Sequence, residues 1–295
     1  MKPLRGTLTA LVTPMRDGEL DLAALSALVE QQIDAGVDGL VPCGTTGESP
    51  TLSEAEHREV VSCVVKLAAG RVPVVAGSGT NSTAGTIALS RLNSGCGADA
   101  LLVVSPYYNK PSQEGLFRHF SAVAQATDLP LVLYNIPGRC GVELSVETIK
   151  RLRDAHRNIA AVKHATGSVV GAADLIAACD IPVLSGDDPI TLPLMSIGAV
   201  GVISVLSNLV PKGVKRLTQA ALAGDWPTAQ AAHRELYPLA KALLSLDTNP
   251  IPIKTALAMR GLCCEEFRLP LCPMSSANKQ KLRALLDGVA AGDDA

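Results

Sequence analysis

Short apolar segments alternate with amphipathic segments along most of this chain, and the apolar segments are predicted to be strands. Eight of them occur, at residues 6–14, 39–46, 72–79, 98–106, 130–137, 159–166, 181–186 and 199–206. Val and Leu occupy both odd and even positions in them, which is typical of parallel strands covered by helices. The segments begin about 18 to 33 residues apart, close to the length of one strand-plus-helix unit.

The intervening segments carry helix signals. Residues 22–35 place apolar side chains near the i, i+3, i+4 pattern. Residues 53–69 open with Ser53 and Glu56, a capping box, and residues 145–154 begin in a similar way. Eight such units predict a (β/α)8 barrel. The alternative, an open doubly wound sheet, would usually have fewer strands and a glycine-rich nucleotide-binding turn.

The strand pattern stops after Leu206, and only helical patterns follow. We therefore predict a barrel in residues 1–226 that carries the active site, and a C-terminal helical region in residues 227–295. Breaks are expected at residues 224–225, 247–250 and 268–273. The small, acidic tail at residues 288–295 is expected to fray.

Composition narrows the class of protein. Hydrophobic residues make up 47% of the chain and the net charge is −2, so a large core is expected and nucleic acid is not the expected partner. No apolar run is long enough to span a membrane, and the N-terminus does not resemble a signal peptide. For a bacterial source the expected location is the cytoplasm. The eight cysteines form no C-x-x-C pair, so we expect reduced thiols and no zinc site.

Reactive side chains gather where the predicted strands end, which is where barrel enzymes bind their substrates. Three of the four tyrosines lie there, in the runs at residues 106–109 and 134–139. The most informative residue is Lys163, inside the apolar run at residues 159–167. A desolvated lysine amine can attack a carbonyl and form a Schiff base. The alternative is a lysine that reaches solvent or pairs with an acid.

The other strand ends offer groups that suit such chemistry. Thr45 and Thr46 can bind a carboxylate through hydroxyl and backbone N–H groups, or they can simply cap a turn. Tyr134 can move protons near the amine, or it can be a core tyrosine. Arg139 can grip a second carboxylate, or it can form a surface ion pair. Gly44, Gly47, Gly77 and Gly79 are expected where the backbone approaches closely or adopts positive φ.

Taken together, these motifs resemble the dihydrodipicolinate synthase family. These are pyruvate-dependent Schiff-base aldolases, grouped with N-acetylneuraminate lyase. The resemblance covers nearly the whole chain and rests on residues 44–48, 105–111, 134–139, Lys163 and 201–205. It implies condensation of pyruvate with L-aspartate 4-semialdehyde through a lysine Schiff base. The product would be 4-hydroxy-tetrahydrodipicolinate, on the route to diaminopimelate and lysine. The reaction would need no cofactor and no metal.

The resemblance also implies residue roles. Lys163 would form the imine, and Thr46, Tyr134 and Tyr108 would relay protons, with Tyr108 reaching into a neighbouring subunit's site. The family is typically a homotetramer built from tight dimers. The remaining implied groups bind substrate. They are Thr45 and Thr46 for the pyruvate carboxylate, Arg139 for the aspartate semialdehyde carboxylate, Gly186 at a strand end, and the Ile203 carbonyl facing the site.

Two alternatives to this function remain. One is a lyase for a sugar acid, although those relatives resemble the chain without the Gly-Arg pair that contains Arg139. The other is a barrel that binds keto acids without catalysis. The residue after Lys163 is usually glutamate in the family and is His164 here. Strand alternation should turn His164 towards the helix layer, with little effect on the chemistry.

A feedback site for L-lysine is implied at the dimer interface of lysine-inhibited members. The matching positions here are Ser49, Pro50, Glu54, His57, Asn81, Gly85 and Tyr107. Gly85 replaces the glutamate that would pair with the α-ammonium of lysine, and Glu54 replaces a histidine. An unpaired buried ammonium is costly. We therefore expect this site to be degraded and inhibition by L-lysine to be weak or absent.

Overall fold

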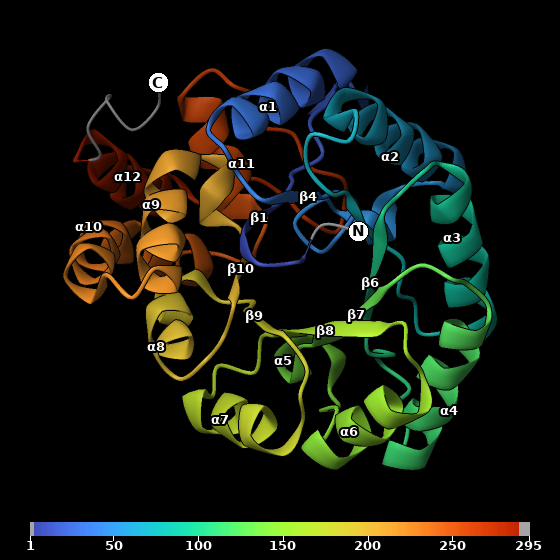
Figure 1. Cartoon of the computed structure of the whole chain (residues 1–295). Coiled ribbons are helices and arrows are strands. Elements are labelled where there is room, and N and C mark those ends of the chain that lie inside the picture. The colour runs from blue at the N-terminus through green and yellow to red at the C-terminus, as the bar shows by residue number, and fades with distance from the viewer. Residues whose placement is uncertain (1–2, 289–295) are drawn as a thin grey trace.

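The computed structural model describes residues 3–288, and a parallel sheet of eight strands forms its centre (Figure 1). The sheet runs in the order β4-β1-β10-β9-β8-β7-β6-β5, and a parallel bridge between Leu40 and Val74 joins its two ends into a barrel. Its strands are β1 (Gly6–Ala10), β4 (Gly39–Val41), β5 (Val75–Gly77), β6 (Ala100–Val104), β7 (Leu131–Asn135), β8 (Ile159–His164), β9 (Val183–Ser185) and β10 (Gly201–Ser204).

Helices surround the barrel and follow its strands in turn, as Figure 1 shows. They are α1 (Leu22–Asp34), α2 (Glu54–Ala68), α3 (Thr83–Gly95), α4 (Gln113–Gln125), α5 (Pro137–Cys140), α6 (Val146–Ala155), α7 (Val169–Ala178), α8 (Thr191–Ser196) and α9 (Pro211–Leu222). Three further helices complete the described chain, namely α10 (Trp226–Ser245), α11 (Ile251–Met259) and α12 (Ser276–Asp287).

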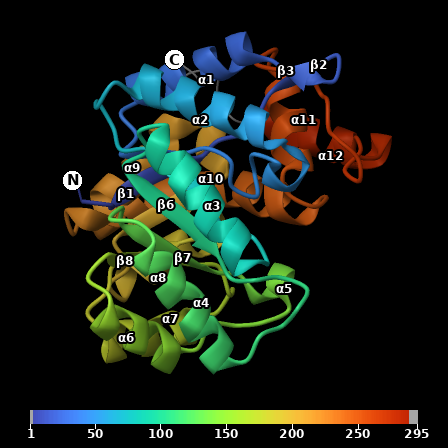
Figure 2. The same cartoon turned by 90° about the vertical axis from the view of Figure 1, so that its right-hand side faces the viewer.

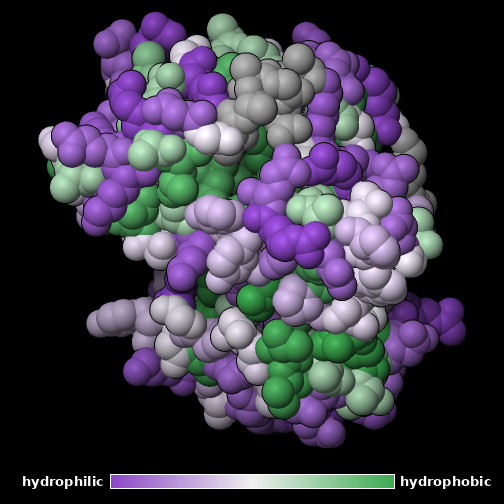
Figure 3. All heavy atoms as spheres, turned by 90° about the vertical axis from the view of Figure 1, so that its left-hand side faces the viewer, coloured by the Kyte–Doolittle hydropathy of each residue, from purple (hydrophilic) through white to green (hydrophobic). Residues whose placement is uncertain are grey.

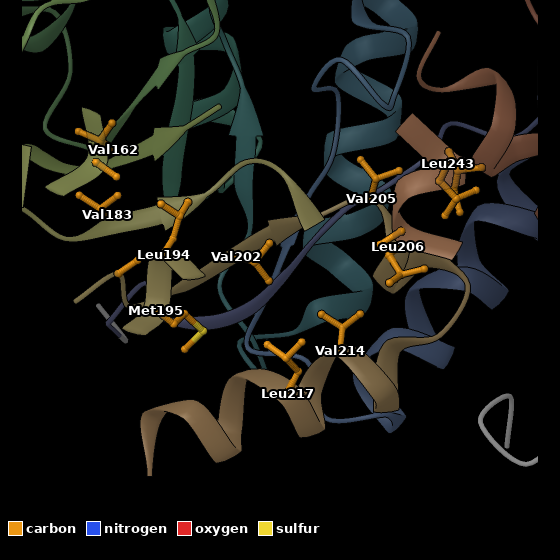
Figure 4. Packing of buried hydrophobic residues seen from close by; sticks show 14 of the residues in the cluster. Val162, Val183, Leu194, Met195, Val202, Val205, Leu206, Val214, Leu217 and Leu243 are labelled. Carbon is orange, nitrogen blue, oxygen red and sulfur yellow. The ribbon is translucent and has the colours of Figure 1, made fainter. Parts of the chain in front are cut away.

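Strand alternation divides the core into an interior and an outer layer. Side chains such as Val41, Leu102, Ala161 and Ile203 fill the inside of the barrel. The other face of each strand packs on the helices. Figure 4 shows Val202 of β10 in the cluster that also holds residues of α9 and α10. A filled interior leaves only the strand ends available for substrates.

The predicted (β/α)8 fold is confirmed, with all eight strands shorter than the apolar runs that indicated them. The capping box at the start of α2 is present, with Ser53 and Glu56 bonding each other's backbone N–H groups. A short hairpin of β2 (Met15–Arg16) and β3 (Glu19–Leu20) was not predicted, because each strand has two residues and gives no periodic signal.

The C-terminal helices pack against the barrel. Residues of α10, α11 and α12 share one hydrophobic cluster with residues of β8 and β10. Figure 2 shows α5 and α11 towards the same end of the barrel. The division between residues 226 and 227 stays a prediction, and the tail at residues 289–295 lies outside the described range. Helix α12 ends at Asp287, just before it.

Much of the face shown in Figure 3 is polar, and a group of hydrophobic residues lies in its lower part. Val170 of α7 is 71% exposed. None of the helices in the described range combines the length and apolarity that a membrane crossing requires. All eight cysteines fall within residues 3–288 and are unpaired.

Candidate active site

Lys163 lies inside the barrel near the carboxyl end of β8. It shares its face of the strand with Ala161 and Ala165, both in the interior cluster, and only 5% of the residue is exposed. Its Cα partners in the neighbouring strands are Tyr134 and Leu184. Within the described residues, no carboxylate forms an ion pair with the Lys163 Nζ, so the sequence-based alternative of a paired lysine has no support here.

Tyr134 faces Lys163 at close range. The Lys163 Nζ lies 4.3 Å from the centre of the Tyr134 ring, and Tyr134 is 5% exposed. The face of an aromatic ring attracts a cation, so the contact holds the amine in a defined place. The ring therefore positions the amine, and Tyr134 itself belongs to the interior cluster that contains Ala161 and Ala165.

Gly186 at the end of β9 leaves the space that the Lys163 side chain occupies. A Cβ atom at position 186 would lie 2.6 Å from the Ala165 Cβ and 3.1 Å from the Lys163 Cε. The next residue, Asp187, is a nearby acid. Burial raises the pKa of the Asp187 carboxyl, and the positive charge of Lys163 opposes that rise.

The two threonines after β4 have different surroundings. Thr45 is half-buried and lines a cavity, whereas Thr46 is 2% exposed. The Thr46 Oγ1 accepts a hydrogen bond of 3.1 Å from the Nδ2 of Asn249. Thr45 is thus the threonine with open access to the cavity, and the relay role that the resemblance gives Thr46 stays a prediction.

Arg139 projects from the short helix α5 at the cavity edge. Its Nη2 donates to the carbonyl oxygen of Asn249 at 3.0 Å. In the part of the chain that the structure describes, no carboxylate pairs with this guanidinium, so the predicted alternative of a surface ion pair is not seen. The charge is free to meet an anionic ligand.

Tyr108 points away from the molecule. It is 88% exposed and has a φ of 74°. A non-glycine residue in this left-handed region is strained, so the turn needs other contacts to hold it. One such contact is the hydrogen bond of 2.8 Å from the Asn109 Nδ2 to the Asn81 carbonyl. Within one chain Tyr108 does not meet Lys163 or Tyr134.

A cavity of about 700 Å³ lies over these strand ends. Thr45 and Arg139 line it together with six of the seven predicted effector-site positions, namely Ser49, Pro50, Glu54, His57, Gly85 and Tyr107. Ile136 and Val104 also line it and pack on the barrel interior, where Tyr134 and Ile203 lie. The predicted substrate-binding residues Thr45 and Arg139 therefore border the same space as the predicted effector positions. Lys163, Tyr134 and Thr46 do not line this cavity.

The His57 side chain is already hydrogen-bonded within the protein. It is buried, and its Nε2 lies 3.0 Å from the Oδ1 of Asn93. The Asn93 Nδ2 donates to Gly77 and Ser78, so the Nε2 of His57 carries the hydrogen. Burial lowers the pKa of this imidazole, so it offers little positive charge.

Two other sequence expectations have clear outcomes. His164 is buried on the helix side of β8, and its Nε2 lies 3.0 Å from the Ser168 carbonyl oxygen, so the predicted orientation is confirmed. Of the four glycines expected in tight places, Gly77 is the clearest, because a Cβ there would lie 1.9 Å from the Cys43 carbonyl oxygen. Gly44 differs, since its Cβ would have ordinary space and its φ is not positive.

The C-terminal residues that reach the site were not predicted. Lys254 and Glu48 form an ion pair of 2.6 Å, with side chains 0% and 1% exposed. A lysine within the apolar run at residues 251–257 is the same kind of signal that singled out Lys163. The acid partner lies 206 residues away in sequence, which no local pattern reveals.

A (β/α)8 barrel with a buried lysine and a facing phenol at its strand ends defines a class of barrel suited to Schiff-base chemistry. Comparison with known proteins gives the family. The model of the dihydrodipicolinate synthetase family matches residues 3–289, and this chain belongs to that family. In residues 3–288 no group of three or more His, Cys, Asp or Glu side chains is placed to hold a metal ion.

Relatives match over almost the full length. The chain is 52% identical to a 4-hydroxy-tetrahydrodipicolinate synthase from Geobacter sulfurreducens, over 96% of this chain and 97% of the relative. The solved structure of such a synthase from Methylacidiphilum fumariolicum has a TM-score of 0.95 at 49% identity, covering 97% and 95% of the two chains. A structure described as a monomeric dihydrodipicolinate synthase variant has a TM-score of 0.94 at 41% identity, covering 96% of each chain.

Proposed function

We propose that this protein condenses pyruvate with L-aspartate 4-semialdehyde to give 4-hydroxy-tetrahydrodipicolinate, as an aldolase-type lyase in diaminopimelate and lysine biosynthesis. The observation that carries the proposal is the unpaired Lys163 amine inside an apolar barrel, 4.3 Å from the Tyr134 ring. Full-length relatives named for this reaction support it.

The chemistry begins at the Lys163 amine, which attacks the keto carbon of pyruvate. Loss of water gives an imine, and loss of a methyl proton gives an enamine whose carbon attacks the aldehyde. The amino group of the semialdehyde then attacks the imine carbon, which closes the ring and releases the Lys163 amine. No cofactor is required, because the protonated imine itself withdraws electrons. Tyr134 carries protons to and from the reacting oxygen, and the threonine pair at residues 45 and 46 holds the pyruvate carboxylate and contributes the relay hydroxyl. The Ile203 carbonyl and Gly186 complete the wall of the pyruvate-binding site.

Arg139 selects the second substrate. Its guanidinium has no acidic partner in the described residues and borders the cavity, so it can bind a carboxylate with two hydrogen bonds. L-Aspartate 4-semialdehyde carries such a carboxylate near its aldehyde. A sugar aldehyde offers only hydroxyl groups at that place.

The assay that tests this function compares the two aldehyde classes. Purified protein with pyruvate and L-aspartate 4-semialdehyde should consume both, while pyruvate with a sugar aldehyde should react far more slowly. Faster turnover of the sugar aldehyde would identify a sugar-acid lyase. Failure with every aldehyde, together with tight binding of pyruvate, would identify a keto-acid binding protein.

Self-association belongs to the same proposal. Tyr108 is 88% exposed on a strained turn, which suits a phenol that enters a second subunit's site. We further propose that two such dimers form a homotetramer in the cytoplasm. Mixing chains that carry Tyr108→Phe with chains that carry Lys163→Ala should restore part of the activity if Tyr108 acts across the interface.

A further inference from the structure

The segment at residues 249–254, which leads into α11, contacts the loop at residues 44–48. Asn249 donates from its Nδ2 to the Thr46 Oγ1 at 3.1 Å. Five residues later, Lys254 forms its fully buried ion pair of 2.6 Å with Glu48. The two contacts fix both the reactive part and the end of the same loop.

This loop needs external support. Cys43, which precedes the loop, and Glu48, its last residue, each have a φ of 54°, in the left-handed region that costs energy for non-glycine residues. Such backbone persists only when surrounding contacts over-determine it. The carboxylate of Glu48 has two such contacts, since Oε1 meets Lys254 and Oε2 accepts from the backbone N of Arg268 at 3.3 Å.

The hydrogen bond to Thr46 also sets a direction. The amide nitrogen of Asn249 can only donate, so the hydroxyl oxygen of Thr46 accepts and its own hydrogen must point elsewhere. Thr46 is 2% exposed, so few directions are open to it. The Asn249 side chain therefore restricts how this hydroxyl presents itself to the site.

Asn249 also touches the opposite side of the cavity. Its carbonyl oxygen accepts the hydrogen bond of 3.0 Å from the Arg139 Nη2. One residue thus contacts the threonine proposed to bind pyruvate and the arginine proposed to bind the aldehyde. We propose that Asn249 is a positioning residue that orients the Thr46 hydroxyl, and that Lys254 fixes the segment to the loop through Glu48. The inference rests on the proposed function only in that Thr46 belongs to the site.

A double-mutant cycle tests this inference. The full-length variants are Asn249→Ala, Thr46→Val and the two combined, with steady-state rates measured against pyruvate and against the aldehyde. Asn249→Ala alone should lower kcat/KM for pyruvate about fivefold, the worth of one ordinary hydrogen bond. In the Thr46→Val background, Asn249→Ala should lower kcat/KM for pyruvate less than about twofold, because the hydroxyl that accepts the hydrogen bond is already absent. Thr248→Ala, an exposed neighbour, is the matched control and should behave as the wild type.

The outcomes separate this inference from the proposed function. Borohydride trapping of pyruvate on wild-type Lys163 tests the function by itself. If trapping succeeds and Asn249→Ala costs the same factor in both backgrounds, or nothing in either, the positioning role is overturned. If Asn249→Ala lowers the Tm by many degrees, Asn249→Asp replaces it, since it keeps the size and removes the donor. A loss that follows the Tm alone in both variants also overturns the inference.

Discussion

Lys163 and Tyr134 are register partners in two neighbouring parallel strands, and the amine of one lies over the ring of the other. The strand register fixes the two Cα atoms beside each other in the barrel wall. It also places the phenol beside the atom that would attack a carbonyl. We therefore expect a keto acid to modify Lys163 before any other lysine.

Pyruvate followed by borohydride should inactivate the protein and add one reduced pyruvyl group to each chain, on Lys163. Peptide mass spectrometry locates the group, and borohydride without pyruvate is the control. A chelator should leave the reaction unchanged. Modification of another lysine, or none, would contradict the Schiff-base assignment.

Replacing Gly186 by Ala should displace the Lys163 side chain, because the new methyl group would lie 3.1 Å from its Cε and 2.6 Å from the Ala165 Cβ. We expect at least a tenfold slower trapping of pyruvate, which corresponds to about 1.4 kcal/mol. Gly95→Ala in α3 is the control, because a Cβ there meets nothing within 4 Å. Equal trapping rates in the two variants would show that the barrel wall around Gly186 accommodates a methyl group without displacing Lys163.

Arg139→Ala should weaken use of the aldehyde much more than formation of the pyruvate imine. A charge-assisted pair contributes about 1.5–3 kcal/mol, so kcat/KM for the aldehyde should fall at least tenfold. Arg118→Ala, at an exposed i,i+4 pair with Glu114, provides the control. Kinetics with aspartate semialdehyde within about twofold of the wild type would exclude the proposed grip.

L-Lysine should inhibit weakly or not at all at millimolar concentration. Gly85 supplies no counter-charge, Glu54 is occupied by Arg58 at 3.2 Å, and burial lowers the pKa of His57. Initial rates at fixed substrate and increasing lysine measure the effect. Half-inhibition below about 0.5 mM, tighter than the roughly 4 kcal/mol of a millimolar site, would show a working effector site. Gly85→Glu should strengthen inhibition.

Lys254→Met should destabilise the protein by about 3–5 kcal/mol, because it leaves the Glu48 carboxylate buried without its partner. Adding Glu48→Gln should recover much of that loss, since the uncompensated charge is then removed. Urea unfolding measures both. Arg58→Ala breaks an exposed pair and should cost less than about 1 kcal/mol. If Lys254→Met alone were as stable as the wild type, water would have to reach the Glu48 carboxylate.

Local patterns in the sequence predicted the barrel well, because each strand and helix has its own period. The strands ended earlier than the apolar runs, since those runs continue into the buried loops that form the site. Lys163 and Tyr134 were found because a polar side chain stands out in an apolar strand. Asn249 and Lys254 were not, because their meaning depends on partners more than 200 residues away.

The same separation has a consequence for how the molecule is made. Glu48 and Lys254 are 206 residues apart, a distance that a ribosome covers in roughly 10 to 40 seconds at about 5–20 residues per second. During that interval the loop at residues 44–48 exists without the two contacts that hold it. The barrel strands are all synthesised before α11 appears, so the nascent chain acquires its complete catalytic geometry only as its last helices emerge.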